Sequence, residues 1–141
     1  HLPHAMSYGV THLMHDITTD GYNVACPFVP HGISVVVNAP SIFRYLGSAA
    51  PQRHLAAAGF LGAGDTDAGP EDAGDVVAER LIELMRDTKM PNGISGVGFG
   101  DEDITALSES SIRQTRAINN APRVANLSDI ESIYRDAISY W

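Results

Sequence analysis

Apolar residues recur every three or four positions through most of this 141-residue chain. That period places them on one face of an α-helix, whereas a half-buried strand needs strict alternation. The stripe near the end of the chain is the clearest and comprises Ile130, Ile133, Tyr134, Ala137, Ile138 and Trp141. Such a face has to pack on other helices. We therefore predict an all-α fold in a single helical domain that spans residues 1–141, a length that is sufficient for a hydrophobic core.

Capping residues and prolines predict where these helices begin. Ser128 followed by Glu131 has the spacing of a capping box and predicts the start of the last helix. Pro51 predicts a second helix, which runs past Phe60 and ends at the following glycines. Asp101 predicts the N-cap of a third, which begins near Ile104.

The longest predicted helix starts near Pro70 and ends before Pro91-Asn92-Gly93. Its inward residues are predicted to be Val77, Leu81, Leu84 and Met85. The glycine-rich segment that follows, residues 93–100, has no preceding strand and no following Lys-Ser or Lys-Thr, so we predict a tightly turned connector rather than a phosphate cradle.

Residues Ile33 to Val37 allow two interpretations. Their β-branched side chains suit a strand, while their continuation to Leu46 suits a helix. Propensity alone favours a strand. We predict a helix, because a lone strand has no partner in a chain of helical periods and because the chain resembles a known family of helical domains. Pro40 then predicts a kink or a break.

Composition restricts the setting and the partners. Lys and Arg number 9 against 17 Asp and Glu, a balance that repels phosphate backbones and argues against nucleic acid. Cys26 is the single cysteine, which excludes an internal disulfide and predicts a cytoplasmic protein. The apolar run at residues 33–37 is too short to span a bilayer, so we predict no membrane segment.

Histidines gather near the start of the chain, where five of the six lie before position 32. His1 with His4, and His12 with His15, share a helical face at a spacing that suits a metal ion. Neither pair has the glutamate of a zincin motif, so surface or hydrogen-bonded histidines remain the alternative. All four on one ion is a poor fit, because they would span more than three helical turns.

His31 lies in Pro30-His31-Gly32. The proline restricts the backbone just before His31, and the glycine permits close contact by a neighbouring chain or a ligand. The imidazole can therefore be held in one direction, toward a ligand. An ordinary loop histidine that caps the next helix is the alternative. His54 and Cys26 are predicted to be structural or loop residues without a chemical role.

Three motifs taken together resemble the iron-containing (group III) alcohol dehydrogenase family. They are His1-Leu2-Pro3-His4-Ala5-Met6-Ser7-Tyr8, Tyr22-Asn23-Val24 and Val29-Pro30-His31-Gly32. Further similarity at Pro51 to Leu55, Leu61-Gly62-Ala63, Ala73-Gly74 and Gly98-Phe99 extends the resemblance over essentially the whole chain. Within the family, Tyr8, Tyr22-Asn23 and the long segment between the two key histidines are most similar to the hydroxyacid-oxoacid transhydrogenase branch.

The resemblance implies the helical C-terminal domain of the dehydroquinate synthase-like fold, without its N-terminal α/β nucleotide-binding domain. It implies that His4 and His31 supply two ligands to a divalent metal, Fe²⁺ first and Zn²⁺ second, while an aspartate and a histidine come from outside this chain. NAD(P) is implied to bind mainly to the missing domain. Tyr8 is implied to line the nicotinamide side of the cleft.

The implied activity is hydride transfer from a hydroxy acid similar to 4-hydroxybutyrate to an oxoacid, with the isolated chain inactive. The chain opens at His1, without an initiator Met and inside a histidine-bearing segment, which we interpret as truncation. Gly9 stands where the branch has proline and Cys26 where histidine is common, and both are expected beside the cleft, where they affect substrate choice. The alternative function is a free-standing helical interaction module whose amphipathic helices form a homo-oligomer such as a homodimer, with incidental histidines.

Overall fold

The protein is described by a computed structural model that covers residues 1–14, 17, 21–22, 24–64 and 67–141. All the regular elements of these residues are helices, and the same residues form no strand. This confirms the all-α prediction.

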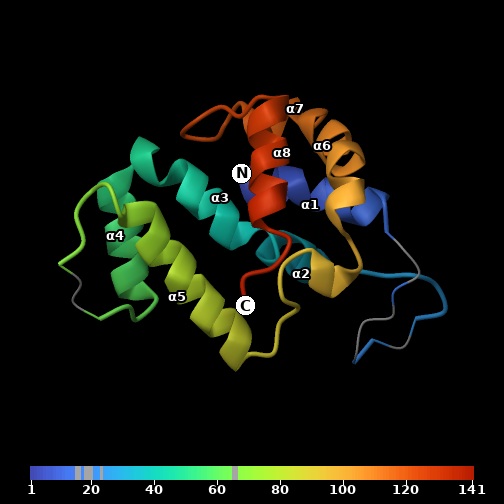
Figure 1. The fold of residues 1–141 in the computed structure, drawn as a ribbon, viewed down its shortest axis with the longest axis horizontal. Coiled ribbons are helices and arrows are strands. Elements are labelled where there is room, and N and C mark those ends of the chain that lie inside the picture. Colours follow the sequence, from blue (N-terminus) through green and yellow to red (C-terminus); the bar gives the residue numbers. More distant parts are fainter. Residues whose placement is uncertain (15–16, 18–20, 23, 65–66) are drawn as a thin grey trace.

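Eight α-helices and three short 3₁₀-helices are described (Figure 1). The α-helices are α1 (Leu2–His12), α2 (His31–Val36), α3 (Ala39–Leu46), α4 (Pro51–Phe60), α5 (Ala73–Asp87), α6 (Ile104–Ile112), α7 (Thr115–Ile118) and α8 (Leu127–Asp136). The 3₁₀-helices are η1 (Gly47–Ala49), η2 (Ser95–Val97) and η3 (Asp101–Asp103).

The helices form two groups that share α3. On one side, α5 packs against α3 and α4, as the left half of Figure 1 shows. On the other side, α6 lies between α1 and α8, and α1 also contacts α2 and α7. Because α3 contacts both α5 and α8, the two groups are one packed body.

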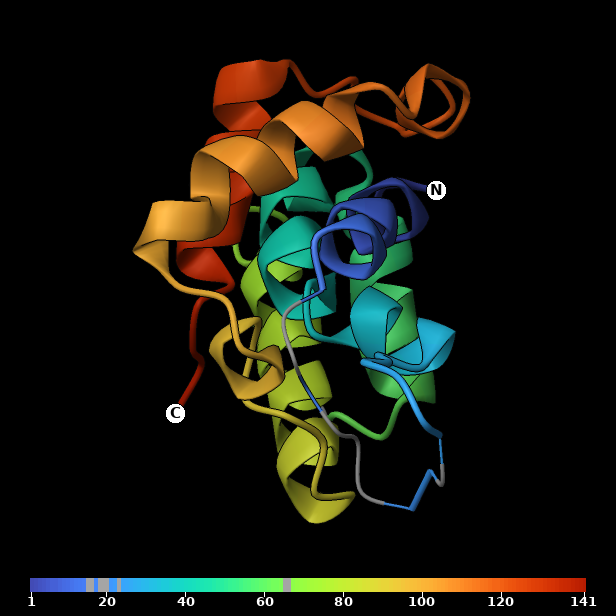
Figure 2. The same cartoon turned by 90° about the vertical axis from the view of Figure 1, so that its right-hand side faces the viewer.

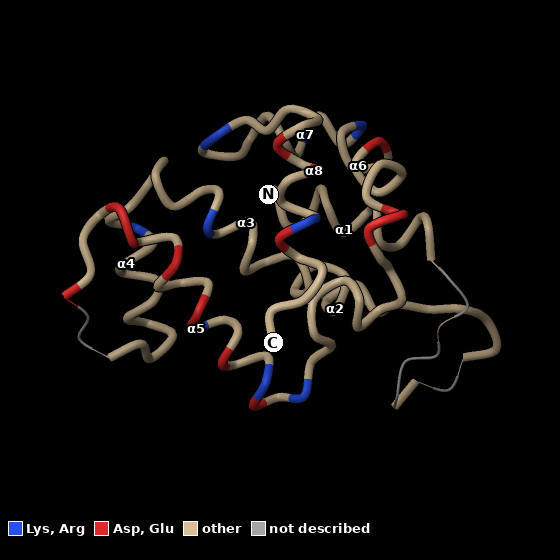
Figure 3. The backbone as a smooth tube through the Cα atoms, in the orientation of Figure 1, with Lys and Arg blue, Asp and Glu red and all other residues tan. Residues whose placement is uncertain are grey.

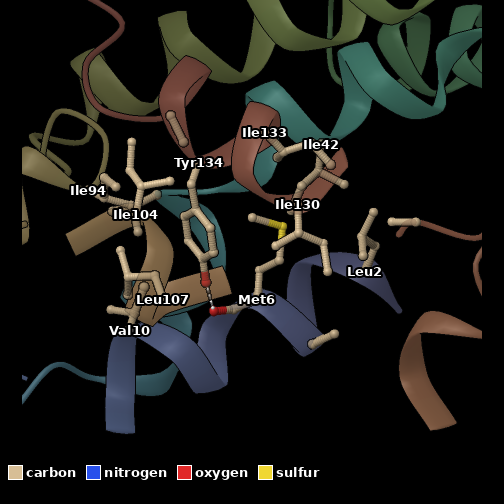
Figure 4. Close-up of a cluster of buried hydrophobic side chains, with 14 of the residues drawn as sticks. Leu2, Met6, Val10, Ile42, Ile94, Ile104, Leu107, Ile130, Ile133 and Tyr134 are labelled. Atoms are coloured by element: carbon tan, nitrogen blue, oxygen red, sulfur yellow. Dashed lines mark hydrogen bonds between the residues drawn. The ribbon is translucent and has the colours of Figure 1, made fainter. Parts of the chain in front are cut away.

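The core of the second group is built around Tyr134 of α8 (Figure 4). Its ring is fully buried, and its hydroxyl donates to the Met6 carbonyl of α1 at 2.7 Å. The same hydroxyl lies 2.7 Å from Ser111 Oγ of α6. Buried polar groups are costly unless they are paired, so these contacts fix three helices relative to one another. The surrounding apolar side chains include Leu2, Met6, Val10, Leu107 and Ile130.

Gly9 lets α1 approach this cluster closely. A Cβ at Gly9 would lie 2.5 Å from Tyr134 Oη, 2.6 Å from Ser111 Oγ and 2.8 Å from the Leu107 carbonyl oxygen. Real Cβ atoms do not approach that near. Gly9 therefore faces the core between α6 and α8, and the expectation that it lies beside the cleft is wrong.

The glycine-rich segment is the predicted connector. The backbone amides of residues 94–99 all donate to backbone carbonyls, those of Ile94 and Ser95 to Ala137 and Ile138 at the end of α8. Gly93 has a φ of +63°. With its amides already paired, the segment has no row of free donors for a phosphate.

Two expected helix starts are displaced in the structure, while the helix expected to begin near Ile104 begins there as α6. The last helix is capped by Asn126 with Asp129, not by Ser128 with Glu131, and the Asp129 amide donates to Asn126 Oδ1 at 2.9 Å. Helix α5 begins at Ala73, because Pro70 lies in the preceding turn. Asp101 caps nothing: it begins η3, where Asp103 Oδ2 accepts from the Gly100 amide.

The predicted inward faces are correct in part. On α5, Val77 and Met85 are buried as expected, but Leu81 and Leu84 are only half-buried and Ile82 takes the inward place. At the C-terminus, Trp141 is 42% exposed because α8 has already ended at Asp136. Helix α4 begins at Pro51 as predicted.

The helical interpretation of residues 33–37 is confirmed, with a break before Pro40. Helix α2 ends at Val36 and α3 begins at Ala39, so Pro40 lies in the first turn of the new helix. Tyr140 secures this junction, because its hydroxyl donates to the Val37 carbonyl at 3.0 Å. Burial raises the pKa of Tyr140 to about 12, although its hydrogen bonds with Ser41 act in the opposite direction.

Alanine substitutions at two helical glycines are expected to have opposite effects. Gly9→Ala places a methyl group inside occupied space and should lower the free energy of unfolding by about 2 kcal/mol or more. Gly59→Ala, in α4, meets nothing within 4 Å and should raise it by about 0.5–1 kcal/mol. Urea unfolding of both variants measures this, and equal effects would contradict the packing assigned to Gly9.

Tyr140→Phe should change how stability responds to alkaline pH. The folded state keeps Tyr140 protonated up to a pKa of about 12, whereas the unfolded side chain ionises near 10. The raised pKa of Tyr140 therefore contributes to the free energy of unfolding. This contribution is complete below pH ~10 and is lost as pH rises toward 12, at up to about 1.4 kcal/mol per pH unit. The variant should therefore show a shallower loss of stability between about pH 10 and about pH 12. An unchanged slope in urea unfolding would refute the assignment.

Candidate metal centre

His4 lies in the first half of α1, on its exposed side. Its neighbours Ala5 and Met6 are completely buried, so the helix is held firmly while the imidazole stays accessible. The hydroxyl of Ser7, itself buried, donates to the His4 carbonyl at 2.8 Å. This bond fixes the backbone that carries the ring.

His31 is the first residue of α2 and is held in the same way. Val29 and Pro30 before it are buried, and Pro30 is the N-cap residue of the helix. The buried Ser34 hydroxyl donates to the His31 carbonyl at 2.8 Å. Both histidines thus occur in a His-x-x-Ser pattern whose serine secures the carbonyl of the histidine.

The two imidazoles converge. Their ring centroids lie 4.9 Å apart at an interplanar angle of 81°. A nitrogen ligand lies about 2.0–2.1 Å from a metal such as zinc, so two rings that share an ion at roughly a right angle have centroids roughly 4.5–5.2 Å apart. The observed pair fits a common divalent cation.

Tyr8 lies one turn beyond His4 on the same face of α1. Its ring meets His4 edge-on at a centroid distance of 5.2 Å and approaches His12 at 5.7 Å. It also lines an open cleft of about 390 Å³ between α1 and α7. The cleft is bordered by His1, His4, Tyr8, Gln114, Arg116, Ala117 and Asn120. In Figure 2 the elements α1, α2 and α7 lie toward the same side of the molecule.

Of the other histidines, His1 borders the same cleft as His4, and His12 Nδ1 lies 3.2 Å from Ser110 Oγ. His15 is outside the described residues. His54 is buried with Nδ1 2.8 Å from the Ala50 carbonyl oxygen, in agreement with its predicted structural role. The spacing of three therefore does not identify the partner of His4, which comes from a different helix.

Carboxylates are absent from the helices that carry the pair. Neither α1 nor α2 contains Asp, Glu, Lys or Arg, and both are drawn without charge colours in Figure 3. Over residues 1–14, 17, 21–22, 24–64 and 67–141, no three His, Cys, Asp or Glu side chains group closely enough to hold a metal. Two imidazoles alone leave most of a coordination sphere open, so this pair could supply only part of a metal site.

A Cβ at Gly32 would meet nothing within 4 Å, so the close contact expected there with a neighbouring chain or a ligand stays a prediction. Cys26 is a free, exposed loop thiol, as predicted.

Sequence reasoning missed the far wall of the cleft. Gln114, Arg116 and Asn120 line it from in and around α7, yet they form no recognisable motif. The repeated His-x-x-Ser pattern was also missed, although it can be read directly from residues 4–7 and 31–34. Only the tertiary fold brings α7 to the histidines.

Comparison with known proteins places the chain beside metal-dependent dehydrogenases. Residues 3–138 match the model of the Fe-containing alcohol dehydrogenase family, C-terminal. The mitochondrial hydroxyacid-oxoacid transhydrogenase of Mus musculus is 34% identical over the whole chain, and the Homo sapiens protein is also 34% identical. A probable mitochondrial hydroxyacid-oxoacid transhydrogenase of Dictyostelium discoideum is 30% identical.

The chain spans about 30% of the length of the mouse and human relatives. Two solved structures share its fold. A 1,3-propanediol oxidoreductase superposes with a TM-score of 0.77 at 24% identity, over 96% of this chain and 32% of the other. An archaeal halo-thermophilic alcohol dehydrogenase from a Red Sea brine pool superposes with a TM-score of 0.74 at 19% identity, over the same shares.

The cytoplasmic location expected from the single cysteine is wrong on this comparison, because the relatives are named as mitochondrial proteins. A reducing environment and a lone thiol do not distinguish the two compartments. Within the described part of the chain, no helix has the length and hydrophobicity needed to cross a membrane.

Proposed function

The chain belongs to the Fe-containing alcohol dehydrogenase family, and on that premise we propose that it is the helical, metal-contributing half of an NAD(P)-linked oxidoreductase. Membership confirms the resemblance found in its motifs and the expected C-terminal helical fold. The observation that supports the proposal most directly is the 4.9 Å approach of the His4 and His31 rings.

In this proposal His4 and His31 hold a divalent metal, with Fe²⁺ preferred over Zn²⁺. A cation of this kind supplies Lewis acidity, which lowers the pKa of a substrate hydroxyl and polarises a carbonyl in the reverse direction. The serine bonds to the His4 and His31 carbonyls restrain the backbone that carries each ring, so little backbone ordering is required when the ligands engage.

The remaining ligands and the nucleotide site come from outside this chain. Two imidazoles do not complete a catalytic coordination sphere, and the chain corresponds to about 30% of its mouse relative. We therefore propose that it works joined to an N-terminal nucleotide-binding domain. The isolated chain is expected to be inactive.

The proposed reaction moves a hydride from the hydroxyl-bearing carbon of a hydroxy acid to the nicotinamide and from there to an oxoacid. The relatives named hydroxyacid-oxoacid transhydrogenase support this choice of substrates. Tyr8 lines the cleft and meets the His4 ring edge-on, so we assign it to the nicotinamide side, where it excludes water and orients His4.

The free-standing interaction module is less well supported. Incidental histidines need not lie together, whereas His4 and His31 belong to different helices and their ring centroids are still 4.9 Å apart.

Metal content tests the ligand assignment. In the full-length protein that carries this chain, His4→Ala and His31→Ala should each weaken metal binding by about 10-fold or more, because each removes one ligand directly. His12→Ala is the matched control, since this exposed histidine is on the same helix but is bonded to Ser110. Inductively coupled plasma mass spectrometry after dialysis against chelator provides the measurement.

The double variant His4→Ala/His31→Ala should also lose hydride transfer, followed by nicotinamide absorbance. If it retains a full complement of metal, the two histidines are not the ligands. If His12→Ala loses as much metal as the double variant, the effect is one of stability rather than coordination.

A further inference from the structure

The cleft beside the histidines has two chemically different walls. Tyr8 and His4 form one wall on α1, and Gln114, Arg116 and Asn120 form the other on and around α7. A ligand that approaches His4 through this cleft therefore passes a guanidinium and two amides.

Arg116 carries a positive charge that the described residues leave uncompensated. Arg44, Arg80, Arg123 and Arg135 each form an ion pair with Asp or Glu. Arg116 makes no such pair with any described carboxylate, and the facing helix α1 contains no Asp or Glu. In a chain with a net charge of −8, a cation left free in a cleft is available to an anionic ligand.

The backbone around Arg116 is fixed. The Asn120 side-chain amide donates to the Arg116 carbonyl at 2.9 Å, and the Ile118 amide donates to the Gln114 carbonyl at 3.1 Å. Ile118 is buried in the core, which anchors this short helix. The guanidinium thus extends from a positioned element and not from a free loop.

A carboxylate matches this wall. Guanidinium binds carboxylate through two parallel, charge-assisted hydrogen bonds, and a glutamine amide can donate one more. We propose that Arg116, assisted by Gln114, binds the carboxylate of a hydroxy acid whose hydroxyl end points to the His4 wall, and so selects hydroxy acids over uncharged alcohols. The inference rests on the proposed function, because it assigns the substrate class of the same cleft.

Binding of a matched ligand pair tests the inference. 4-Hydroxybutyrate and 1,4-butanediol share a four-carbon chain and differ in the carboxylate, and their affinities for the metal-loaded full-length protein can be measured by isothermal titration calorimetry. Arg116→Gln should weaken 4-hydroxybutyrate binding about 10- to 100-fold, the range of a charge-assisted pair, and leave 1,4-butanediol within about twofold. Gln114→Ala should weaken only the acid, by about 3- to 10-fold.

Arg113→Gln is the matched control, because Arg113 is an exposed arginine just after α6 that does not border the cleft. It should bind both ligands as the unmodified protein does. Arg116→Lys, which keeps the charge without the planar fork, should give an intermediate affinity for the acid.

The inference is wrong if the unmodified protein binds the acid and the diol with equal affinity, or if Arg116→Gln binds the acid as tightly as the unmodified protein does. It is also wrong if Arg116→Gln loses affinity for both ligands equally, which would indicate a structural role for Arg116. Repeating the titration with metal-free protein separates this test from the metal assignment, since the contribution of Arg116 to acid binding should persist when His4 and His31 hold no ion.

Discussion

The hydrogen bond from Tyr134 to the Met6 carbonyl is the interaction on which the arrangement of this domain depends. It joins the last helix to the first, and Ser111 of α6 completes the contact at 2.7 Å. Gly9 makes the approach possible, because any larger residue would meet the same hydroxyl. The direction of α1 is therefore set at its buried face, while His4 and Tyr8 on its other face remain accessible. One face of α1 therefore packs in the core, and the opposite face carries the side chains of the candidate site.

A second anchor sets the position of His31. Helix α2 is short, and a helix of six residues has little stability of its own. It is held by buried Val29 and Pro30 at one end and by the bond from Tyr140 to the Val37 carbonyl at the other. Both candidate ligands are thus positioned by residues near the C-terminus, Tyr134 and Tyr140, which lie far from them in sequence. The site depends on the complete fold of the chain.

The sequence predicted the helices well because their apolar period and the prolines are local signals. The predicted cap of the last helix was wrong because several residues in this segment are of capping type. Asn126 accepts from the Asp129 amide and Asp129 accepts from the Asn126 amide, so the capping box begins two residues before Ser128. The convergence of His4 with His31 was available only from the family resemblance, since no local period links them. Arg116 could not be identified at all, because a single arginine in a polar segment carries no motif.

Helices α1 and α2 contain no acidic residues. This matters for a metal centre whose ligands come from two domains, as we propose. Neutral imidazoles tolerate exposure without a cation, whereas a carboxylate cluster built for a metal repels itself when the ion is gone. A helical half that contributes only histidines can therefore fold before the metal and the other half are in place. In the enzyme that we propose, the carboxylate ligand would come with the nucleotide-binding domain, and the cation would neutralise its charge.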